Sequence, residues 1–224
     1  MKGEQMLPII SIVGASNSGK TTFLEKLIPE LVSRGYRVGA VKHDAHGFEM
    51  DREGKDTWRL RRAGAGVVAI SSADQLASIR RTEAEMSLQE IAGRFFWTED
   101  ILITEGFKRA HFPKIEVFRA AVEPKPICGQ GDNLIAIVSD DTVDAQVPKF
   151  SFADPRGVAE FIENRYLKDR KKRKMLLHLD DKPVPMNDFA EDFVVKGIKG
   201  MLSALRGYDN PKTISILIRL GEDD

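Results

Sequence analysis

The feature that most constrains this chain is residues 14–21, which read Gly-Ala-Ser-Asn-Ser-Gly-Lys-Thr. A short apolar run rich in β-branched residues precedes them at 9–13, and apolar residues follow at helical spacing over 23–32. Gly14 and Gly19 allow the backbone to turn tightly, so that successive N–H groups point inward. A buried strand, a turn of this kind and an amphipathic helix, in this order, predict an α/β fold.

The same segment has the composition of a phosphate-binding loop. Inward-pointing amides and the positive end of the helix that starts near Lys20 attract phosphate oxygens. Lys20 supplies a mobile positive charge for the β- and γ-phosphates of a nucleotide, and the Thr21 hydroxyl is a ligand for Mg²⁺. The alternative is a chance match in a Gly/Ser turn, which the strand before and the helix after disfavour.

The rest of the first 167 residues alternates between strand and helix patterns. Strands are predicted at residues 36–42, 67–70, 101–104, 115–118 and 134–138. Further helices are predicted at residues 57–63, 87–97 and 155–167, the first with Asp56 as N-cap and the second with a Ser87–Glu90 capping box. Because several strands are apolar throughout, we predict a three-layer α/β domain of the P-loop NTPase type, with a mostly parallel sheet, over residues 1–167.

The composition changes after this domain. Residues 165–174 hold seven basic residues and one acid, so 168–174 are predicted to be a basic linker. A small α+β extension is predicted over 175–224, with a strand at 175–179, a turn around 181–183, a helix at 188–206 and a strand at 213–220. This segment is short for a core of its own, so we expect it to dock or to self-associate. The apolar stripe of its helix is expected to pack against its two strands, and the alternative is a homodimer contact through the same face.

The overall composition excludes several classes of protein. The chain has 34 Lys and Arg against 34 Asp and Glu, which makes a strongly basic nucleic-acid binder unlikely. Its single cysteine, Cys128, cannot form an internal disulfide, and no apolar run approaches the length of a membrane span. These observations favour a cytoplasmic protein.

Acidic residues at the ends of two predicted strands are candidates for the chemistry. Glu105 directly follows the strand at 101–104 and is a candidate Mg²⁺ ligand, although it could instead cap the following turn. Asp51 or Asp56, in the loop after the second strand, could orient an attacking water; the alternative is a solvated loop with Asp56 acting only as a helix cap.

Two histidines in the same loop, His43 and His46, raise the possibility of a metal site with His111 or Cys128. Their spacing is not a zinc pattern and no second cysteine supports it. A solvated or hydrogen-bonded histidine pair is the favoured interpretation.

Taken together, these motifs and their order carry a resemblance. They comprise the phosphate loop, Lys42-His43-Asp44 with His46, Asp51-x-x-Gly54-Lys55-Asp56, Ala63-Gly64-Ala65, Glu105-Gly106-Phe107-Lys108 and the run at 134–140. Over residues 7–167 the chain resembles the molybdopterin-guanine dinucleotide biosynthesis protein B (MobB) family. The resemblance implies a GTP-binding P-loop protein, an accessory or adaptor protein with weak Mg²⁺-dependent GTPase activity. Such a protein would act with the molybdenum cofactor guanylyltransferase that converts molybdopterin to its guanine dinucleotide form.

The resemblance also implies roles for individual residues. Thr21 and Glu105 would serve Mg²⁺, Asp51 would lie near the γ-phosphate, and Ser139 and Asp140 would occupy the position from which related GTPases read guanine. The phosphates would be bound by Gly14, Ala15, Ser16, Asn17, Ser18, Gly19, Lys20, Thr21 and Thr22. Lys20 would stabilise phosphate charge during hydrolysis while Asp51 or Asp56 positions water.

Some features depart from the pattern of many GTPases. The guanine-reading Asn-Lys-x-Asp sequence is absent, and no arginine is identifiable as a catalytic finger. A small-molecule kinase and a nucleotide-binding scaffold without hydrolysis therefore stay open as alternatives. The basic run at 165–174 could receive the anionic molybdopterin, although a solvated linker is favoured.

Overall fold

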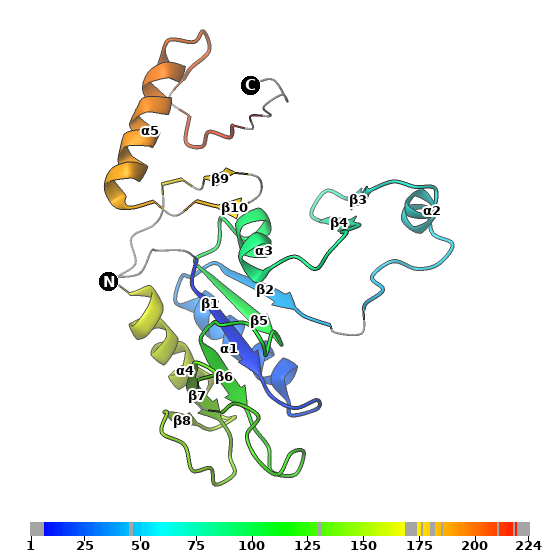
Figure 1. Cartoon of the computed structure of the whole chain (residues 1–224), viewed down its shortest axis with the longest axis vertical. Helices are drawn as coiled ribbons and strands as arrows, with labels where there is room; N and C mark the ends of the chain where they lie inside the picture. The colour runs from blue at the N-terminus through cyan, green and yellow to red at the C-terminus, as the bar shows by residue number, and fades with distance from the viewer. Residues whose placement is uncertain are drawn as a thin grey trace.

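The computed structural model describes residues 7–44, 47–129, 131–168, 174–175, 177–179, 182–184, 186–209, 211–216 and 218. Its centre is a six-stranded sheet in which every neighbouring pair is parallel, with the order β2-β5-β1-β6-β7-β8 (Figure 1). The strands are β1 (Ile9–Val13), β2 (Val38–Lys42), β5 (Ile101–Glu105), β6 (Lys114–Val117), β7 (Leu134–Val138) and β8 (Lys149–Phe150). The short edge strand β8 was not predicted.

Helices cover both faces of this sheet. The helices are α1 (Lys20–Ser33), α3 (Leu88–Phe95) and α4 (Pro155–Ile162), the last continuing as a π-helical turn, η1 (Glu163–Leu167). On one face, Ile10 and Ile12 are fully buried together with Leu27 and Leu31 of α1 and with α4. On the other face, Ile9 and Leu102 pack against α3. The strands are apolar on both sides because both sides are covered, and the predicted α/β fold is confirmed.

The topology decides where the functional residues meet. In a parallel sheet all strands end at the same edge, and ligands bind outside those carboxyl ends. The phosphate loop follows β1, Glu105 is the last residue of β5, Arg119 follows β6 and Ser139 follows β7. Residues that are far apart in the sequence are therefore neighbours at one edge.

A small arm stands apart from the sheet, as Figure 1 shows. It consists of α2 (Asp56–Arg62), β3 (Val67–Ser71) and β4 (Leu76–Arg80), and its two strands form a separate antiparallel pair. The prediction of a buried strand at 67–70 was wrong in its environment, since the side chain of Ile70 is 62% exposed. The chain turns at Ser72 and pairs the strand with the next segment instead of inserting it into the main sheet.

Within the described residues, the extension has shorter strands and a shorter helix than predicted. It contains the two-residue strands β9 (His178–Leu179) and β10 (Lys182–Pro183), which pair antiparallel, and the helix α5 (Asp188–Ser203). The segment predicted as a turn around 181–183 thus contributes a strand, and the helix ends three residues early. The strand predicted at 213–220 was wrong for its described part, 213–216 and 218, which is not assigned to any strand and pairs with none in the described structure. Most of the basic linker, 169–173, lies outside the described residues.

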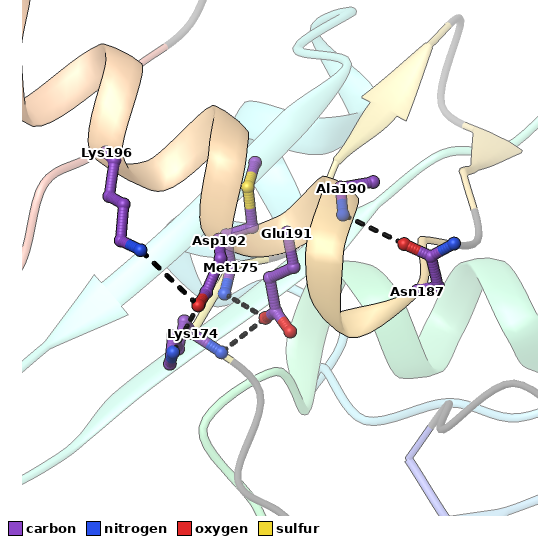
Figure 2. A network of polar contacts seen from close by, with 7 residues as sticks. All are labelled: Lys174, Met175, Asn187, Ala190, Glu191, Asp192 and Lys196. Atoms are coloured by element: carbon purple, nitrogen blue, oxygen red, sulfur yellow. Dashed lines mark hydrogen bonds and ion pairs between the residues drawn. The ribbon is translucent and has the colours of Figure 1, made fainter.

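Hydrogen bonds and ion pairs join residues 174–175 to helix α5 of the extension (Figure 2). The backbone N–H groups of Lys174 and Met175 both donate to the carboxylate of Glu191 on α5. Asp192 pairs with Lys174 and, at 3.8 Å, with Lys196. The strand β10 of the extension lies against α3 and so connects the extension to the first domain.

Side chains cap three of the helices at their N-termini. The predicted capping box is confirmed: Ser87 Oγ accepts from the Glu90 N–H at 3.2 Å, and the Glu90 carboxylate accepts from the Ser87 N–H at 2.7 Å. Asp154 caps α4 and Asn187 caps α5 through a single hydrogen bond each, accepted from the N–H groups of Gly157 and Ala190. For α2 the prediction was wrong, because Lys55 is the N-cap and Asp56 is the first helical residue, where a carboxylate still favours the helix dipole. No helix in the described ranges is long and apolar enough to cross a membrane.

Candidate phosphate-binding site

The loop between β1 and α1 is wound tightly against β6. Gly14 has φ +149°, and a Cβ placed on it would lie 2.3 Å from the carbonyl oxygen of Val117. Asn17 and Gly19 also have positive φ angles, of 62° and 94°, and Gly19 is the N-cap of α1. These left-handed turns curl the backbone in front of the helix, as the predicted loop requires. Ser18 Oγ is buried without a hydrogen-bond partner in the described structure.

Lys20 folds back over the loop that precedes it. Its Nζ donates to the carbonyl oxygen of Ala15 at 2.7 Å and to that of Gly14 at 3.4 Å. Burial lowers the pKa of Lys20 below its usual value, while the charge of Glu105 opposes this shift. The ammonium group is thus held at the beginning of the loop, within reach of anything that the loop binds.

The two predicted magnesium ligands meet. Thr21 Oγ1 donates to Glu105 Oε2 at 2.8 Å, although the two residues lie on different elements. The other carboxylate oxygen, Oε1, is 3.7 Å from Lys42 Nζ. A hydroxyl and a carboxylate are oxygen ligands of the kind that Mg²⁺ prefers when it also contacts nucleotide phosphates. The residues present therefore fit a Mg²⁺ ion at this point.

The two candidate water-positioning acids lie in or beside the arm. Thr57 Oγ1 donates to Asp51 Oδ1 at 2.8 Å, whereas Asp51 Oδ2 is buried without a partner in the described structure. Asp56 is 3.9 Å from Arg59 on α2. Within the described residues neither acid forms a hydrogen bond or ion pair with the phosphate loop, so their catalytic roles stay predictions.

Ser139 and Asp140 lie at the end of β7, at the same sheet edge. Asp140 Oδ1 accepts from Ser151 Oγ at 2.6 Å and from the Phe152 N–H at 3.2 Å. The hydrogen bond from Ser151 is the main reason that the pKa of Asp140 is lowered. Ser139 is buried, and its Oγ accepts from the backbone N–H of Asp141. Ser139 therefore shapes the turn, and Asp140 is the side chain that a ligand could reach.

The surroundings of His43 differ from those of a metal ligand. His43 Nε2 is 2.7 Å from Glu85, and the ring lies 4.7 Å from that of Phe107. The described residues contain no cluster of three or more metal-ligating side chains. His46 lies outside the described residues.

Sequence reasoning missed Arg119. It follows the predicted strand at 115–118 and therefore lies at the same edge as the phosphate loop. Its guanidinium carbon is 4.3 Å from the centroid of the Phe152 ring, and its Nη2 is 3.4 Å from the position of a Cβ on Gly19. The sequence signal that could have identified Arg119 is its position directly after a predicted strand of the parallel sheet.

A parallel sheet, a G-x-x-x-x-G-K-T loop between its first strand and helix, and a lysine folded over that loop define the P-loop NTPase-like α/β class. Within this class, residues 9–140 match the family model described as Molybdopterin guanine dinucleotide synthesis protein B. This match spans more than half of the chain, and the chain belongs to that family.

Individual relatives agree with the family match. A molybdopterin-guanine dinucleotide biosynthesis adapter protein of Haemophilus influenzae is 36% identical over 159 residues, which are 70% of this chain and 89% of that protein. The crystal structure of Bacillus subtilis MobB covers 73% of this chain and 100% of its own, with 32% identity and a TM-score of 0.58. The resemblance stated from the motifs is therefore confirmed.

One relative also matches the extension. A putative molybdopterin-guanine dinucleotide biosynthesis adapter protein of Methanocaldococcus jannaschii is 25% identical over 240 residues, covering 94% of this chain and 97% of its own. The Haemophilus relative is nearly covered by 70% of this chain. The extension is thus shared by part of the family, and the phosphate-loop domain by both relatives.

Proposed function

We propose that this protein is a GTP-binding adapter in molybdopterin guanine dinucleotide biosynthesis, with weak Mg²⁺-dependent GTPase activity. The observation that carries the proposal is the phosphate loop, with Lys20 folded over it and the Thr21–Glu105 pair 2.8 Å apart beside it. Membership of the family supports a role in molybdopterin guanine dinucleotide biosynthesis. The protein would assist the guanylyltransferase that joins a guanine nucleotide to molybdopterin.

The chemistry follows from the charges at the loop. Loop amides, the N-terminus of α1 and the Lys20 ammonium would stabilise the negative charge of the phosphates. Thr21 and Glu105 would hold Mg²⁺, which supplies further charge neutralisation at the β- and γ-phosphates. Hydrolysis would be slow, because Asp51 and Asp56 pair with Thr57 and Arg59 rather than with the loop.

Guanine selectivity would come from Asp140. Ser151 and the Phe152 N–H hold its Oδ1, which leaves Oδ2 for a ligand. The Watson–Crick edge of guanine carries two adjacent donors, N1–H and the 2-amino group, and a carboxylate accepts both. An aspartate is ionised at neutral pH at its ordinary pKa, and the hydrogen bond from Ser151 lowers the pKa of Asp140 further. This arrangement favours GTP over ATP.

The partners follow from the adapter role. We propose the molybdenum cofactor guanylyltransferase as the protein partner and molybdopterin as an anion that this complex handles, in the cytoplasm. Self-association is also proposed, since Phe189 and Phe193 on α5 have stacked rings 6.5 Å apart and are each more than 70% exposed. Such apolar side chains are typical of surfaces that another protein covers.

The nucleotide proposal is tested by Lys20→Ala. Titration calorimetry with GTP and Mg²⁺ should detect binding by the wild type and a loss of at least about 100-fold in the variant, because a charged contact to phosphate is removed. Lys26→Ala is the matched control, since Lys26 is exposed on the same helix. Equal affinity of wild type and Lys20→Ala would refute the assignment of the loop.

The adapter role needs a separate test. The tagged full chain should recover the guanylyltransferase from an extract of its own source in the presence of GTP, and Lys20→Ala should recover less. Consistent absence of that enzyme with the wild type, under conditions in which GTP is bound, would favour a kinase or a scaffold.

A further inference from the structure

Arg119 is fixed beside the phosphate loop by an aromatic ring. Its guanidinium carbon lies 4.3 Å from the centroid of the Phe152 ring. Phe152 is itself held by an edge-on contact with Phe23 of α1, with ring centroids 6.3 Å apart. Both Nη2 of Arg119 and the Phe152 ring lie 3.4 Å from the position of a Cβ on Gly19. The arginine therefore has a defined place at the start of α1.

This cation is available to a ligand. Arg119 is exposed, and within the described part of the chain its guanidinium forms no hydrogen bond and no ion pair, whereas its backbone carbonyl accepts from the N–H groups of Val122 and Glu123. Its positive charge contributes, as a lesser cause, to the lowered pKa of Asp140. A guanidinium stacked on a ring keeps its N–H donors in the plane of the fork, free for the bidentate contacts that phosphate accepts.

Its position relative to Lys20 and Asp140 indicates which part of a nucleotide it would meet. Lys20 Nζ lies at Gly14 and Ala15, at the beginning of the loop, and the lysine of such loops serves the β- and γ-phosphates. Arg119 lies at Gly19, at the end of the loop, and stacks on Phe152, whose backbone N–H donates to Asp140 at 3.2 Å. Between the β-phosphate and the base of a nucleotide lies the α-phosphate.

We propose that Arg119 is a nucleotide-binding residue that contacts the α-phosphate of the bound guanine nucleotide. The proposal rests on the proposed function, since it requires that the loop binds a nucleotide. Arg119 supplies a second cation at the far end of the loop from Lys20, and Phe152 orients it. The α-phosphate is present in GTP and GDP alike, so this contact would not distinguish the two.

The experiment compares GTP and GDP affinities of the full chain and its Arg119→Ala variant by titration calorimetry with Mg²⁺. We expect Kd to rise about tenfold to 100-fold for both nucleotides, by the same factor, because a charge-assisted contact is lost. Arg206→Ala, at an exposed residue of the extension, removes the same charge elsewhere and should leave both affinities unchanged. Arg119→Lys keeps the charge without the planar fork and should recover part of the loss.

A second variant tests the role of the ring. Phe152→Leu keeps an apolar side chain against Phe23 but removes the stacking surface, so its Kd should lie between those of the wild type and Arg119→Ala. Unchanged affinity in Arg119→Ala would overturn the proposal, and so would a loss confined to GTP, which would indicate a γ-phosphate contact. If Lys20→Ala is defective while Arg119→Ala is not, only this inference fails. If the wild type binds neither nucleotide, the proposed function fails as well.

Discussion

Asp140 combines an exposed carboxylate with a fixed orientation. Its Oδ1 is occupied by two donors, Ser151 Oγ and the Phe152 N–H, which belong to the segment that follows β8. A carboxylate that is held in this way loses little rotational freedom when it accepts further hydrogen bonds. Because of this geometry, selectivity for the base can be tested by substituting Asp140 alone.

We predict that Asp140→Asn lowers the affinity for GTP by about tenfold or more and leaves the affinity for ATP nearly unchanged. The asparagine amide presents a donor where guanine needs a charged acceptor, and hydrogen bonds to charged groups contribute about 1.5–3 kcal/mol. Competition titrations with GTP and ATP measure both values. An equal loss for both nucleotides would assign Asp140 a structural role only.

The environment of Cys128 disfavours ionisation of its thiol. Burial, and then the negative charge of Glu116, raises the pKa of the Cys128 thiol to about 12. Glu116 is itself buried and accepts from the N–H groups of Ile127 and Cys128. The carboxylate thus fastens the loop after β6 and keeps the thiol protonated.

We predict that Cys128 reacts with iodoacetamide at pH 8.5 about a thousandfold more slowly in the folded protein than in guanidinium chloride. The thiolate is the reactive form, and a pKa of about 12 instead of 9.0 reduces its population by that factor. The raised pKa also favours folding below about pH 9, and this contribution is lost as pH rises from about 9 to about 12, because the unfolded chain ionises first. Comparable alkylation rates in the folded and the unfolded protein would contradict the raised pKa of Cys128.

Helix α3 packs on the sheet through few buried side chains, and a capping box stabilises its N-terminus. Leu88 and Ala92 are its buried residues, and they pack against Ile9 and Leu102. The helix begins with the reciprocal hydrogen bonds between Ser87 and Glu90. A short helix with two buried side chains depends on its cap more than a long one does.

We predict that Ser87→Ala lowers the free energy of unfolding by about 1 kcal/mol, within a range of about 0.5–2 kcal/mol. The substitution leaves the Glu90 N–H without its side-chain acceptor. Urea unfolding followed by circular dichroism measures the change. Ser203→Ala, at the exposed end of α5, is the control and should change stability by less than about 0.5 kcal/mol. Equal effects of the two substitutions would mean that the cap is not stabilising.

Local patterns predicted elements well where the decisive contacts are local. The phosphate loop, α1 and the capping box of α3 depend on residues within a few positions of one another, so their sequences specify them. In the arm, the helix and the strand at 67–70 were predicted, but the buried environment of that strand was wrong and its partner β4 was not predicted. An apolar run such as 67–70 has the same composition in a buried parallel strand and in a hairpin, and the pairing with β4 is not visible in the run itself.

For the molecule as a whole, the phosphate-loop domain contains the entire main sheet and the helices that cover it. The extension contributes a separate two-stranded pair and α5, and it meets the domain where β10 lies against α3. The alignment with the Haemophilus relative covers 89% of that protein with 70% of this chain. The domain therefore carries its own core.

We predict that a chain ending at residue 167 folds and binds GTP with a Kd within about threefold of that of the full chain. The truncation removes none of the strands of the main sheet and no residue of the proposed site. Its thermal midpoint should fall by a few degrees, because part of α3 becomes exposed. Circular dichroism melting and GTP titration test both statements. Failure of the truncated chain to fold would show that the extension completes the core.

The order of the motifs along the sequence was sufficient for the resemblance to the family. The sequence was also sufficient for the class of fold, the phosphate loop and the position of Glu105 beside it. These follow from local chemistry and from the rule that parallel strands end at one edge. Only the tertiary structure decided that Asp56 lies in an arm outside the sheet, with Asp51 in the segment before it, and that Arg119 lies on Phe152 beside Gly19. The physical reason is that such contacts join residues distant along the chain, and their energies depend on which surfaces are already folded and buried.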